Sequence, residues 1–300
     1  MISDKKALIE LCTEAVEAAQ LAGSYIQSQI GEFHKKSKKV AGSSLASQVV
    51  TRVDEKAQCI ILDHLEKSIK KYDLGLLTEE QTDDQSRFLK SYFWCIDPLD
   101  GTLPFTEGKT GYAVSISLVS KKGDPVIGVV YIPDKDDCYM SIKGDGVMLN
   151  GESFYRDKLT FDRSLNVYLD KSLAREDYFD LMTSKLEGWC EKSGFENVSY
   201  NLNYGAVCNA IGVMNSSNGC YFKFPKKQEG GGSIWDFSST RLFFEELGLP
   251  VADMKGNPLH LNSAKTTFMN GLGINYASDL ILSSFIQELH IRLIGLFKAL

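Results

Sequence analysis

Two aspartates lie three residues apart in the stretch CIDPLDGTLPF, residues 95–105. Asp97 follows an apolar run, and Asp100 directly precedes a Gly-Thr pair. Two carboxylates this close repel each other and raise each other's pKa unless a cation lies between them. The spacing therefore predicts a metal site.

The residues around this pair predict a strand that ends in a turn. Residues 92–96 are apolar, and Pro98 cannot continue a central ladder, so we expect the chain to leave the sheet there. Gly101 permits close backbone approach, and Thr102 begins a predicted short helix whose free N–H groups suit a phosphate. A capped turn, in which Asp100 satisfies backbone N–H groups, is the alternative. The aspartyl-phosphate signature D-x-D-G-T is excluded, because proline replaces its nucleophile.

The amino-acid composition indicates a globular protein and argues against several other classes. The 300 residues are 43% hydrophobic and 24% charged, as in an ordinary globular protein with one large or two medium domains. A net charge of -6 argues against a broad nucleic-acid-binding face but permits an anionic substrate if cations are recruited. The seven cysteines form no C-x-x-C pair, so we expect no disulfide framework, no zinc site and a cytoplasmic location. The charged N-terminus and the lack of a long apolar run predict neither export nor a membrane anchor.

Hydrophobic periodicity predicts alternating helices and strands. Apolar positions at helical spacing predict helices over 4–30 and 54–70, joined by a basic mobile loop. Residues 91–142 form a strand-dense block, and a mixed α/β region follows a boundary near residue 155. In that region we expect helices over 175–193, from Ala206, over 235–248 and over 278–298, and strands near 165–170, 197–200 and 219–224. The predicted domains are residues 1–155 and 156–300.

The stretch WCIDPLDGTLPF at 94–105 resembles the signature W-x-x-D-P-[LI]-D-G-[TS]-x-x-F of a phosphatase family. This family of magnesium-dependent, lithium-sensitive phosphatases includes inositol monophosphatase and 3'(2'),5'-bisphosphate nucleotidase. Three further stretches agree with it in the same order: VVTRVDEKAQ at 49–58, LLTEEQ at 76–81 and GGSIWDFSS at 231–239. The resemblance covers about residues 45–260 and implies an α/β fold, a layered αβαβα sandwich.

The resemblance also implies which residues hold the metals. Glu79, Asp97 and the carbonyl of Leu99 would hold one Mg²⁺, and Asp97 would bridge to a second. The second ion would also be held by Asp100 and Asp236, and a third, weaker ion would lean on Glu79. Such hard cations prefer carboxylate and carbonyl oxygens, and two of them stabilise both the attacking and the leaving oxygen of an in-line displacement.

The remaining roles concern water and substrate. Thr102 with Asp54 would orient the attacking water alongside the metal-bound Glu79, and the amides of Gly101 and Thr102 would hold the phosphate. The other expected substrate contacts are Gly205, Ala206, Glu229 and Asp236. Taken singly, Asp54 and Asp236 are typical helix caps and Glu79 is typical of a solvated surface. Their joint occurrence with the Asp97 signature favours the metal site.

Two departures leave the substrate open. Glu229, seven residues ahead of Asp236, falls where inositol-type members place a hydroxyl-binding glutamate. Ala206 lacks the hydroxyl often found after the preceding glycine, and the glycines at 230–232 form either a flexible turn or room for a bulkier leaving group. We predict an inositol monophosphatase-like Mg²⁺-dependent phosphomonoesterase.

Several alternatives remain to that prediction. They are a 3'(2'),5'-bisphosphate nucleotidase acting on 3'-phosphoadenosine 5'-phosphate, a sugar bisphosphatase, and a catalytically silent metal- and nucleotide-binding protein. We expect a small phosphorylated metabolite as partner, with no nucleic-acid polymer and no membrane. A homodimer stays open.

Overall fold

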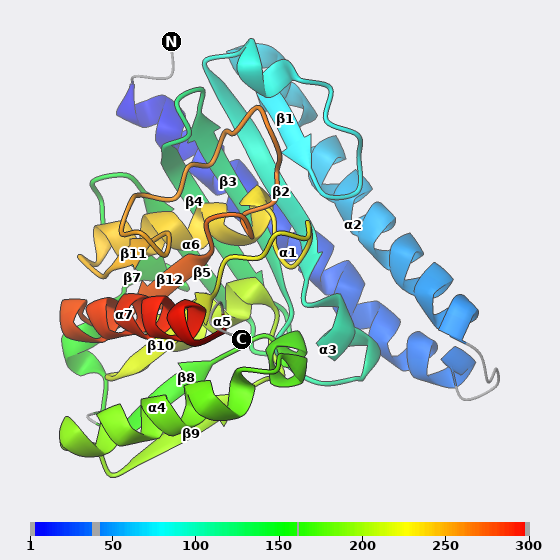
Figure 1. The fold of residues 1–300 in the computed structure, drawn as a ribbon. Coiled ribbons are helices and arrows are strands. Elements are labelled where there is room, and N and C mark those ends of the chain that lie inside the picture. Colours follow the sequence, from blue (N-terminus) through cyan, green and yellow to red (C-terminus); the bar gives the residue numbers. More distant parts are fainter. Residues whose placement is uncertain (1–3, 38–42, 161, 298–300) are drawn as a thin grey trace.

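The computed structural model describes residues 4–37, 43–160 and 162–297, which form five layers in the order αβαβα (Figure 1). Helices α1 (Lys5–Ser37) and α2 (Ser43–Tyr72) cover the outer face of the first sheet. Helices α5 (Ala206–Met214) and α6 (Ile234–Glu246) lie between the two sheets. Helices α4 (Phe179–Lys192) and α7 (Leu280–Phe297) cover the far face of the second sheet. The predicted layered sandwich is confirmed.

The two sheets differ in how their strands follow one another. In the first sheet seven strands lie side by side in chain order: β1 (Gly75–Thr78), β2 (Tyr92–Asp100), β3 (Ala113–Ser120), β4 (Pro125–Ile132), β5 (Asp137–Ile142), β6 (Val147–Leu149) and β7 (Glu152–Ser153). The second sheet has crossovers, and its spatial order is β11 (Val251–Ala252), β12 (Ile274–Ala277), β10 (Gly219–Lys223), β8 (Ser164–Tyr168) and β9 (Asn197–Asn201). The predicted strands and the helices of the C-terminal half are found within a few residues of their expected bounds. None of the helices in the described ranges has the length and apolar content that crossing a bilayer requires.

The two N-terminal helices are longer than predicted. Helix α1 continues to Ser37 and α2 already begins at Ser43, so most of the predicted mobile loop is helical. The residues between, 38–42, lie outside the described ranges. Polar and basic residues have good helix propensity, so a polar composition alone does not end a helix. One consequence is that Asp54 lies inside α2 and does not cap it.

Strand β2 does not end at Pro98, contrary to the prediction. It continues to Asp100, and its pairing with β3 shifts register between Asp97 and Asp100. On its other side β2 pairs with β1 only as far as Ile96, so Pro98 lies beyond that ladder. Proline is tolerated at such an irregularity because no ladder hydrogen bond is lost there. The shift keeps both aspartates on the strand.

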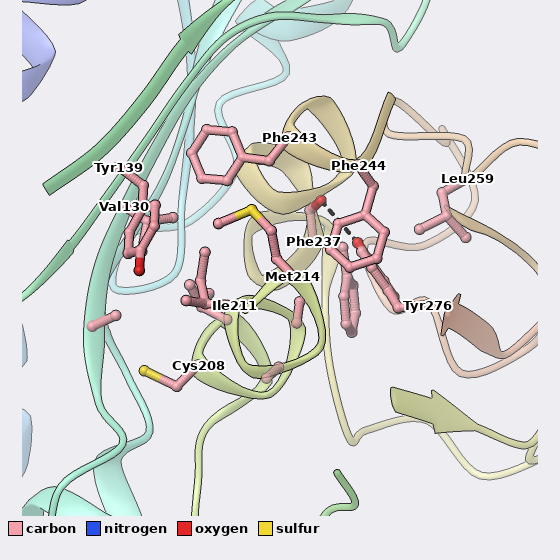
Figure 2. Packing of buried hydrophobic residues seen from close by; sticks show 14 of the residues in the cluster. Val130, Tyr139, Cys208, Ile211, Met214, Phe237, Phe243, Phe244, Leu259 and Tyr276 are labelled. Carbon is pink, nitrogen blue, oxygen red and sulfur yellow. Dashed lines mark hydrogen bonds between the residues drawn. The ribbon is translucent and has the colours of Figure 1, made fainter. Parts of the chain in front are cut away.

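A shared apolar core joins the two halves of the chain. Figure 2 shows Tyr139 of the first sheet facing Met214 and Phe243 of the middle helices, with Tyr276 of the second sheet behind them. The Tyr139 and Phe243 rings lie 6.5 Å apart. The chain passes from one sheet to the other between β7 and β8, near residue 155. The division into two domains there stays a prediction, because the middle helices pack on both sheets.

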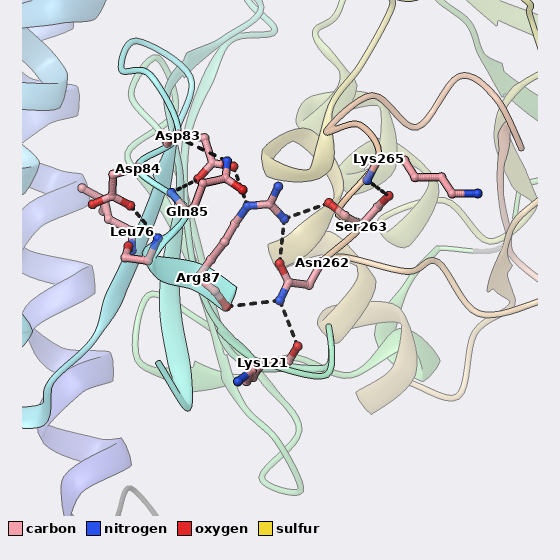
Figure 3. Close-up of polar contacts among 10 residues, drawn as sticks. Leu76, Asp83, Asp84, Gln85, Arg87, Lys121, Asn262, Ser263 and Lys265 are labelled. Atoms are coloured by element: carbon pink, nitrogen blue, oxygen red, sulfur yellow. Dashed lines mark hydrogen bonds and ion pairs between the residues drawn. The ribbon is translucent and has the colours of Figure 1, made fainter. Parts of the chain in front are cut away.

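A buried arginine ties the segment after β1 to the C-terminal half (Figure 3). Arg87 is 3% exposed, and its Nε lies 2.7 Å from an Asp83 oxygen. Its Nη1 donates to the side-chain oxygen of Asn262 at 2.7 Å and to the carbonyl of Ser263 at 3.0 Å. Asn262 in turn donates to the carbonyl of Lys121 at 2.9 Å. A buried charge needs such partners, and the network fixes residues 83–87, which follow Glu79 by a few positions.

Gly128→Ala tests how closely α6 approaches the first sheet. A Cβ on Gly128 would lie 3.0 Å from the carbonyl oxygen of Ser239 and 3.1 Å from a ring carbon of Phe243. We expect the substitution to lower the free energy of unfolding by about 1–3 kcal/mol, measured by urea denaturation. The control is Gly188→Ala in α4, where nothing lies within 4 Å and helix propensity predicts a gain of up to about 1 kcal/mol. Equal effects would contradict this packing.

Candidate active site

Three aspartates from two elements meet beside the middle layer. Asp97 and Asp100 lie at the end of β2, and Asp236 lies in the first turn of α6. One oxygen from each carboxylate lies within 4.8 Å of the others. Asp97 and Asp100 are buried and Asp236 is partly buried. The structure therefore brings together the three aspartates that the sequence analysis assigned to metal binding.

The amino end of α5 fixes Asp100. The amides of Ala206 and Val207 donate to its two oxygens, each at 2.9 Å. The preceding Gly205 has no room for a side chain, because a Cβ there would lie 2.3 Å from an Asp100 oxygen. Asp100 therefore accepts hydrogen bonds from backbone N–H groups, but these belong to α5 and not to its own turn as the capped-turn alternative expected, and the same carboxylate also belongs to the triad.

Local hydrogen bonds orient the other two aspartates. An Asp97 oxygen accepts from the amide of Leu99 at 3.0 Å, and the Leu99 carbonyl accepts from the Thr102 hydroxyl at 3.3 Å. Asp236 accepts from the amide of Ser233 at 2.5 Å in a capping box at the start of α6. A helix cap and a metal ligand are therefore not exclusive roles for Asp236.

The carboxylates of the site repel one another, and this repulsion raises their pKa values. Burial, followed by the charges of Glu79 and Asp236, raises the pKa of Asp97 well above its ordinary value. Burial and the charge of Asp236 do the same for the pKa of Asp100. Burial and Asp236 raise the pKa of Glu79 to about 7, while its contact with Asp97 opposes that rise. Glu79 directly follows β1; the residue as a whole is exposed, although its carboxyl group is desolvated beside the other carboxylates. Such a site needs protons or cations to relieve the repulsion.

Asp54 adds a fifth carboxylate from the outer layer. It is 6% exposed, and burial followed by the charges of Glu80, Glu79 and Glu55 raises its pKa to about 8. Its Oδ1 is buried without a hydrogen-bond partner. A buried polar atom without a partner is costly, so this oxygen fits a ligand, a water or a proton. Oxygen donors of this kind match a hard divalent cation such as Mg²⁺.

Two aspartates of the triad, Asp100 and Asp236, line a cleft with a volume of about 320 Å³. Among the predicted substrate residues, Gly101, Gly205, Ala206 and Asp236 line it. Gly101 has φ 82°, and a Cβ there would lie 2.7 Å from the carbonyl of Gly111, so the floor of the cleft requires glycine. Thr102 begins the short helix α3 (Thr102–Thr106), which is found where it was predicted.

Glu229 is not brought to the cleft. It is exposed on the loop at 224–233, outside the residues that line the cleft, so the structure does not support its expected contact with substrate. Lys223, at the end of β10, lies in the wall instead. A ten-residue loop, 224–233, separates β10 from α6. The number of residues before Asp236 therefore does not predict which residue of this region lines the cleft.

The sequence analysis also missed the polar residues of the walls. Asp170 and Lys171 follow β8, and Lys223 ends β10. Residues at the carboxyl ends of strands often face ligands in α/β folds, and this was the available signal. No motif includes these residues, so the signature alone could not find them.

Comparisons with known proteins identify the family to which a chain with this fold and this acidic triad belongs. A model described as the inositol monophosphatase family matches residues 8–292. The protein named inositol monophosphatase 2 from Solanum lycopersicum is 27% identical over 262 residues, which cover 87% of this chain and 94% of that protein. The putative Nus factor SuhB of Neisseria meningitidis is 27% identical over 231 residues, which cover 76% of this chain and 82% of that protein. The chain belongs to the inositol monophosphatase family, and this membership supports a phosphatase activity.

Solved structures agree on the fold. The structure of inositol monophosphatase from Anabaena superposes with a TM-score of 0.67 over 95% of this chain and 96% of that chain, at 20% identity. At this identity the similarity shows the fold alone. The similarity agrees with the five-layer architecture. The roles of single residues in the cleft are argued from the distances and hydrogen bonds described above.

Asp54→Asn tests the buried charge. The folded pKa near 8 lies above the ordinary carboxyl value, so the metal-free folded state binds the proton more tightly than the unfolded state. This contribution to stability is complete at about pH 4 and is lost as the pH rises to about 8. We expect Asp54→Asn to raise the metal-free unfolding midpoint at pH 8 by at least about 2 °C, with a smaller effect at pH 5.

The control for this substitution is Asp63→Asn, on the exposed side of the same helix. It removes the same charge without relieving a buried carboxyl. Melting curves of the two variants and the unchanged protein, recorded with a chelator at both pH values, make the comparison. Identical midpoints for both variants at pH 8 would contradict the buried charge at Asp54.

Proposed function

We propose that this protein is a Mg²⁺-dependent phosphomonoesterase that hydrolyses a small phosphorylated metabolite with water activated at two metal ions. The observation that carries the proposal is the triad of Asp97, Asp100 and Asp236, whose buried carboxylates repel one another at the head of a cleft. A binding pocket of this size suits a small metabolite. The family membership supports the same class of reaction.

The residues divide into those that hold the ions and those that hold the reactants. Glu79, Asp97 and the Leu99 carbonyl would hold one Mg²⁺, and Asp97, Asp100 and Asp236 a second. A bound Mg²⁺ supplies a polarised water and charge for the leaving oxygen. A third ion near Glu79 belongs to the same proposal.

The protein groups beside the metals position water and phosphate. The Thr102 hydroxyl already lies in this hydrogen-bond network through its bond to the Leu99 carbonyl. Asp54, with an oxygen that lacks a donor, can accept a proton from the attacking water. The amides of Gly101 and Thr102 would hold the phosphate. Each assignment stays a proposal for these residues.

The preferred substrate class is an inositol phosphate or a related phosphomonoester, with bisphosphate nucleotides and sugar bisphosphates as alternatives. Relatives named inositol monophosphatase support the first class. Other relatives carry the name Nus factor SuhB, which favours a second candidate, a protein whose role is not catalytic. We expected no nucleic-acid polymer as a partner, and the name Nus factor SuhB does not support that expectation. A cytoplasmic location and a homodimer remain part of the proposal.

Asp97→Asn tests the metal site. Removing the bridging charge should reduce phosphate release to the rate without enzyme, and Mg²⁺ should no longer raise the unfolding midpoint, since an ion that binds only the folded state stabilises it. Thr102→Ala should leave more activity, because positioning a base or its water is worth about 10²–10⁴ in rate. The measurements are phosphate release and thermal unfolding with and without Mg²⁺.

The matched control is Asp180→Asn, an exposed aspartate on α4 that is not among the residues lining the cleft. It should retain both activity and stabilisation by Mg²⁺. Near-normal turnover in Asp97→Asn would contradict the bridging role. Stabilisation by Mg²⁺ without turnover on any phosphomonoester would favour the non-catalytic candidate.

Lithium provides a further test of the proposal. If a weakly held third ion at the exposed Glu79 takes part, Li⁺ at millimolar concentration should inhibit phosphate release and added Mg²⁺ should alter that inhibition. Inhibition curves at two Mg²⁺ concentrations, with Na⁺ as the control salt, measure the effect. Full insensitivity to Li⁺ would remove the third site and leave the two-metal chemistry in place.

A further inference from the structure

Two buried serines, Ser115 and Ser239, join α6 to the first sheet and are called the serine pair below. Their hydroxyl oxygens lie 3.0 Å apart, and both residues are 0% exposed. Ser239 donates to the carbonyl of Ile116 at 3.1 Å, so its proton is used and Ser115 is the donor between the two hydroxyls. The Ser115 hydroxyl also lies 3.4 Å from the carbonyl of Trp235. The serine pair thus has hydrogen-bond partners on both the strand and the helix.

The serine pair connects the two elements that carry the aspartate triad. Ser115 lies on β3 directly opposite Asp97 of β2, at the last pair before the shift in register. On α6, Ser239 follows Asp236 by about one helical turn, and Trp235 directly precedes Asp236. The pair therefore ties the position opposite one aspartate to the helical turn that carries another.

The aspartates push these two elements apart when no cation lies between them. Asp97 and Asp236 offer oxygens within 4.8 Å of each other, and like charges at this distance repel. Other polar contacts hold α6 further along its length. Arg241 donates to the carbonyl of Gly123 at 2.9 Å, and Glu246 accepts from an amide of the β5–β6 turn at 2.9 Å. These contacts restrain the middle and the end of α6, whereas the serine pair restrains its start.

Magnesium makes a stricter demand on this spacing than calcium does. Mg²⁺ requires ligands at about 2.0–2.1 Å in near-octahedral geometry, whereas Ca²⁺ accepts ligands at about 2.3–2.6 Å in a flexible geometry. Carboxylates on separate elements must therefore be held closer together, and more rigidly, for Mg²⁺. A hydrogen bond between the elements supplies a directional restraint, because its strength depends on distance and angle, whereas apolar packing is non-directional.

We propose that the serine pair positions Asp236 relative to Asp97 at the separation that Mg²⁺ requires, and so favours Mg²⁺ over the larger Ca²⁺. The inference rests on the metal site of the proposed function and adds two positioning residues that lie outside the proposed ligand set. Ser115 and Ser239 act through the elements that carry the aspartates. If the hydroxyls only stabilised the fold, their removal would change the unfolding midpoint and leave the relative affinities for the two ions unchanged.

Calorimetric titration of the chelator-treated protein with Mg²⁺ and with Ca²⁺ tests the serine pair without any substrate. We expect Ser239→Ala to raise the Kd for Mg²⁺ about three- to tenfold, the effect of losing about one hydrogen bond. The Kd for Ca²⁺ should rise by less than about twofold, because Ca²⁺ tolerates a looser site. Ser115→Ala should have the same effect. The double variant should lose no more Mg²⁺ affinity than either single variant, because the two hydroxyls form one contact.

The matched control is Ser117→Ala. Ser117 lies two residues along β3, on the same face of the strand, and is also 0% exposed. Its hydroxyl donates to the carbonyl of Ile127 in β4 at 2.8 Å, so it bonds within the first sheet. Its removal should lower the metal-free unfolding midpoint and leave the Kd of both ions unchanged.

The double variant also guards against poor folding of a single variant. Ser115→Ala with Ser239→Ala leaves neither hydroxyl of the pair without its partner, which lowers the cost of the substitution. It should fold and show the same selective loss of Mg²⁺ affinity.

The outcomes separate this inference from the phosphatase proposal. A selective loss of Mg²⁺ affinity in the serine variants supports the positioning role even if no phosphomonoester is turned over. An equal loss for Mg²⁺ and Ca²⁺, an unchanged Kd for Mg²⁺, or the same loss in Ser117→Ala would overturn the positioning role and leave the phosphatase proposal in place. Absence of Mg²⁺ binding to the unchanged protein would overturn both.

Discussion

Electrostatic repulsion among buried carboxylates is the constraint around which the rest of this structure is arranged. The triad of Asp97, Asp100 and Asp236 is held together by backbone amides and helix starts that do not cancel its charge. The apolar core and the layered packing supply the free energy that keeps these groups out of water. A divalent cation held between these carboxylates would relieve their repulsion, and it would supply the positive charge that the proposed phosphatase reaction uses.

Much of the fold was predictable because its local signals agree with one another. The apolar runs of the strands, the helical spacing and the glycine after α6 all indicated the alternation that the structure shows. The misses have physical causes. The length of α1 and α2 depended on polar residues with adequate helix propensity. The path of β2 past Pro98 depended on the neighbouring strand β1, which ends at Thr78, opposite Ile96. Neither feature is visible in a local window of sequence.

The sequence likewise predicted some residues of the candidate site and missed others. The signature around Asp97 identified two members of the triad, because Asp97 and Asp100 lie in one short motif. Asp54 and Asp236 were read individually as helix caps, and the structure shows that Asp236 does cap while Asp54 lies within α2. The walls escaped prediction because Asp170 and Lys223 lie far apart in the chain and meet only when β8 and β10 pair. Counting back from Asp236 instead selected Glu229.

The two glycines beneath the cleft limit where this architecture can vary. Gly101 and Gly205 each lack room for a single methyl group, because one would collide with the backbone of Gly111 and the other with Asp100. The floor of the cleft, where the proposed function places the phosphate, therefore has no room for side chains at these two positions. Substitutions that change which leaving group fits, whether by evolution or by engineering, are therefore limited to the side walls of the cleft. There, residues at strand ends can be replaced without altering the proposed reaction centre.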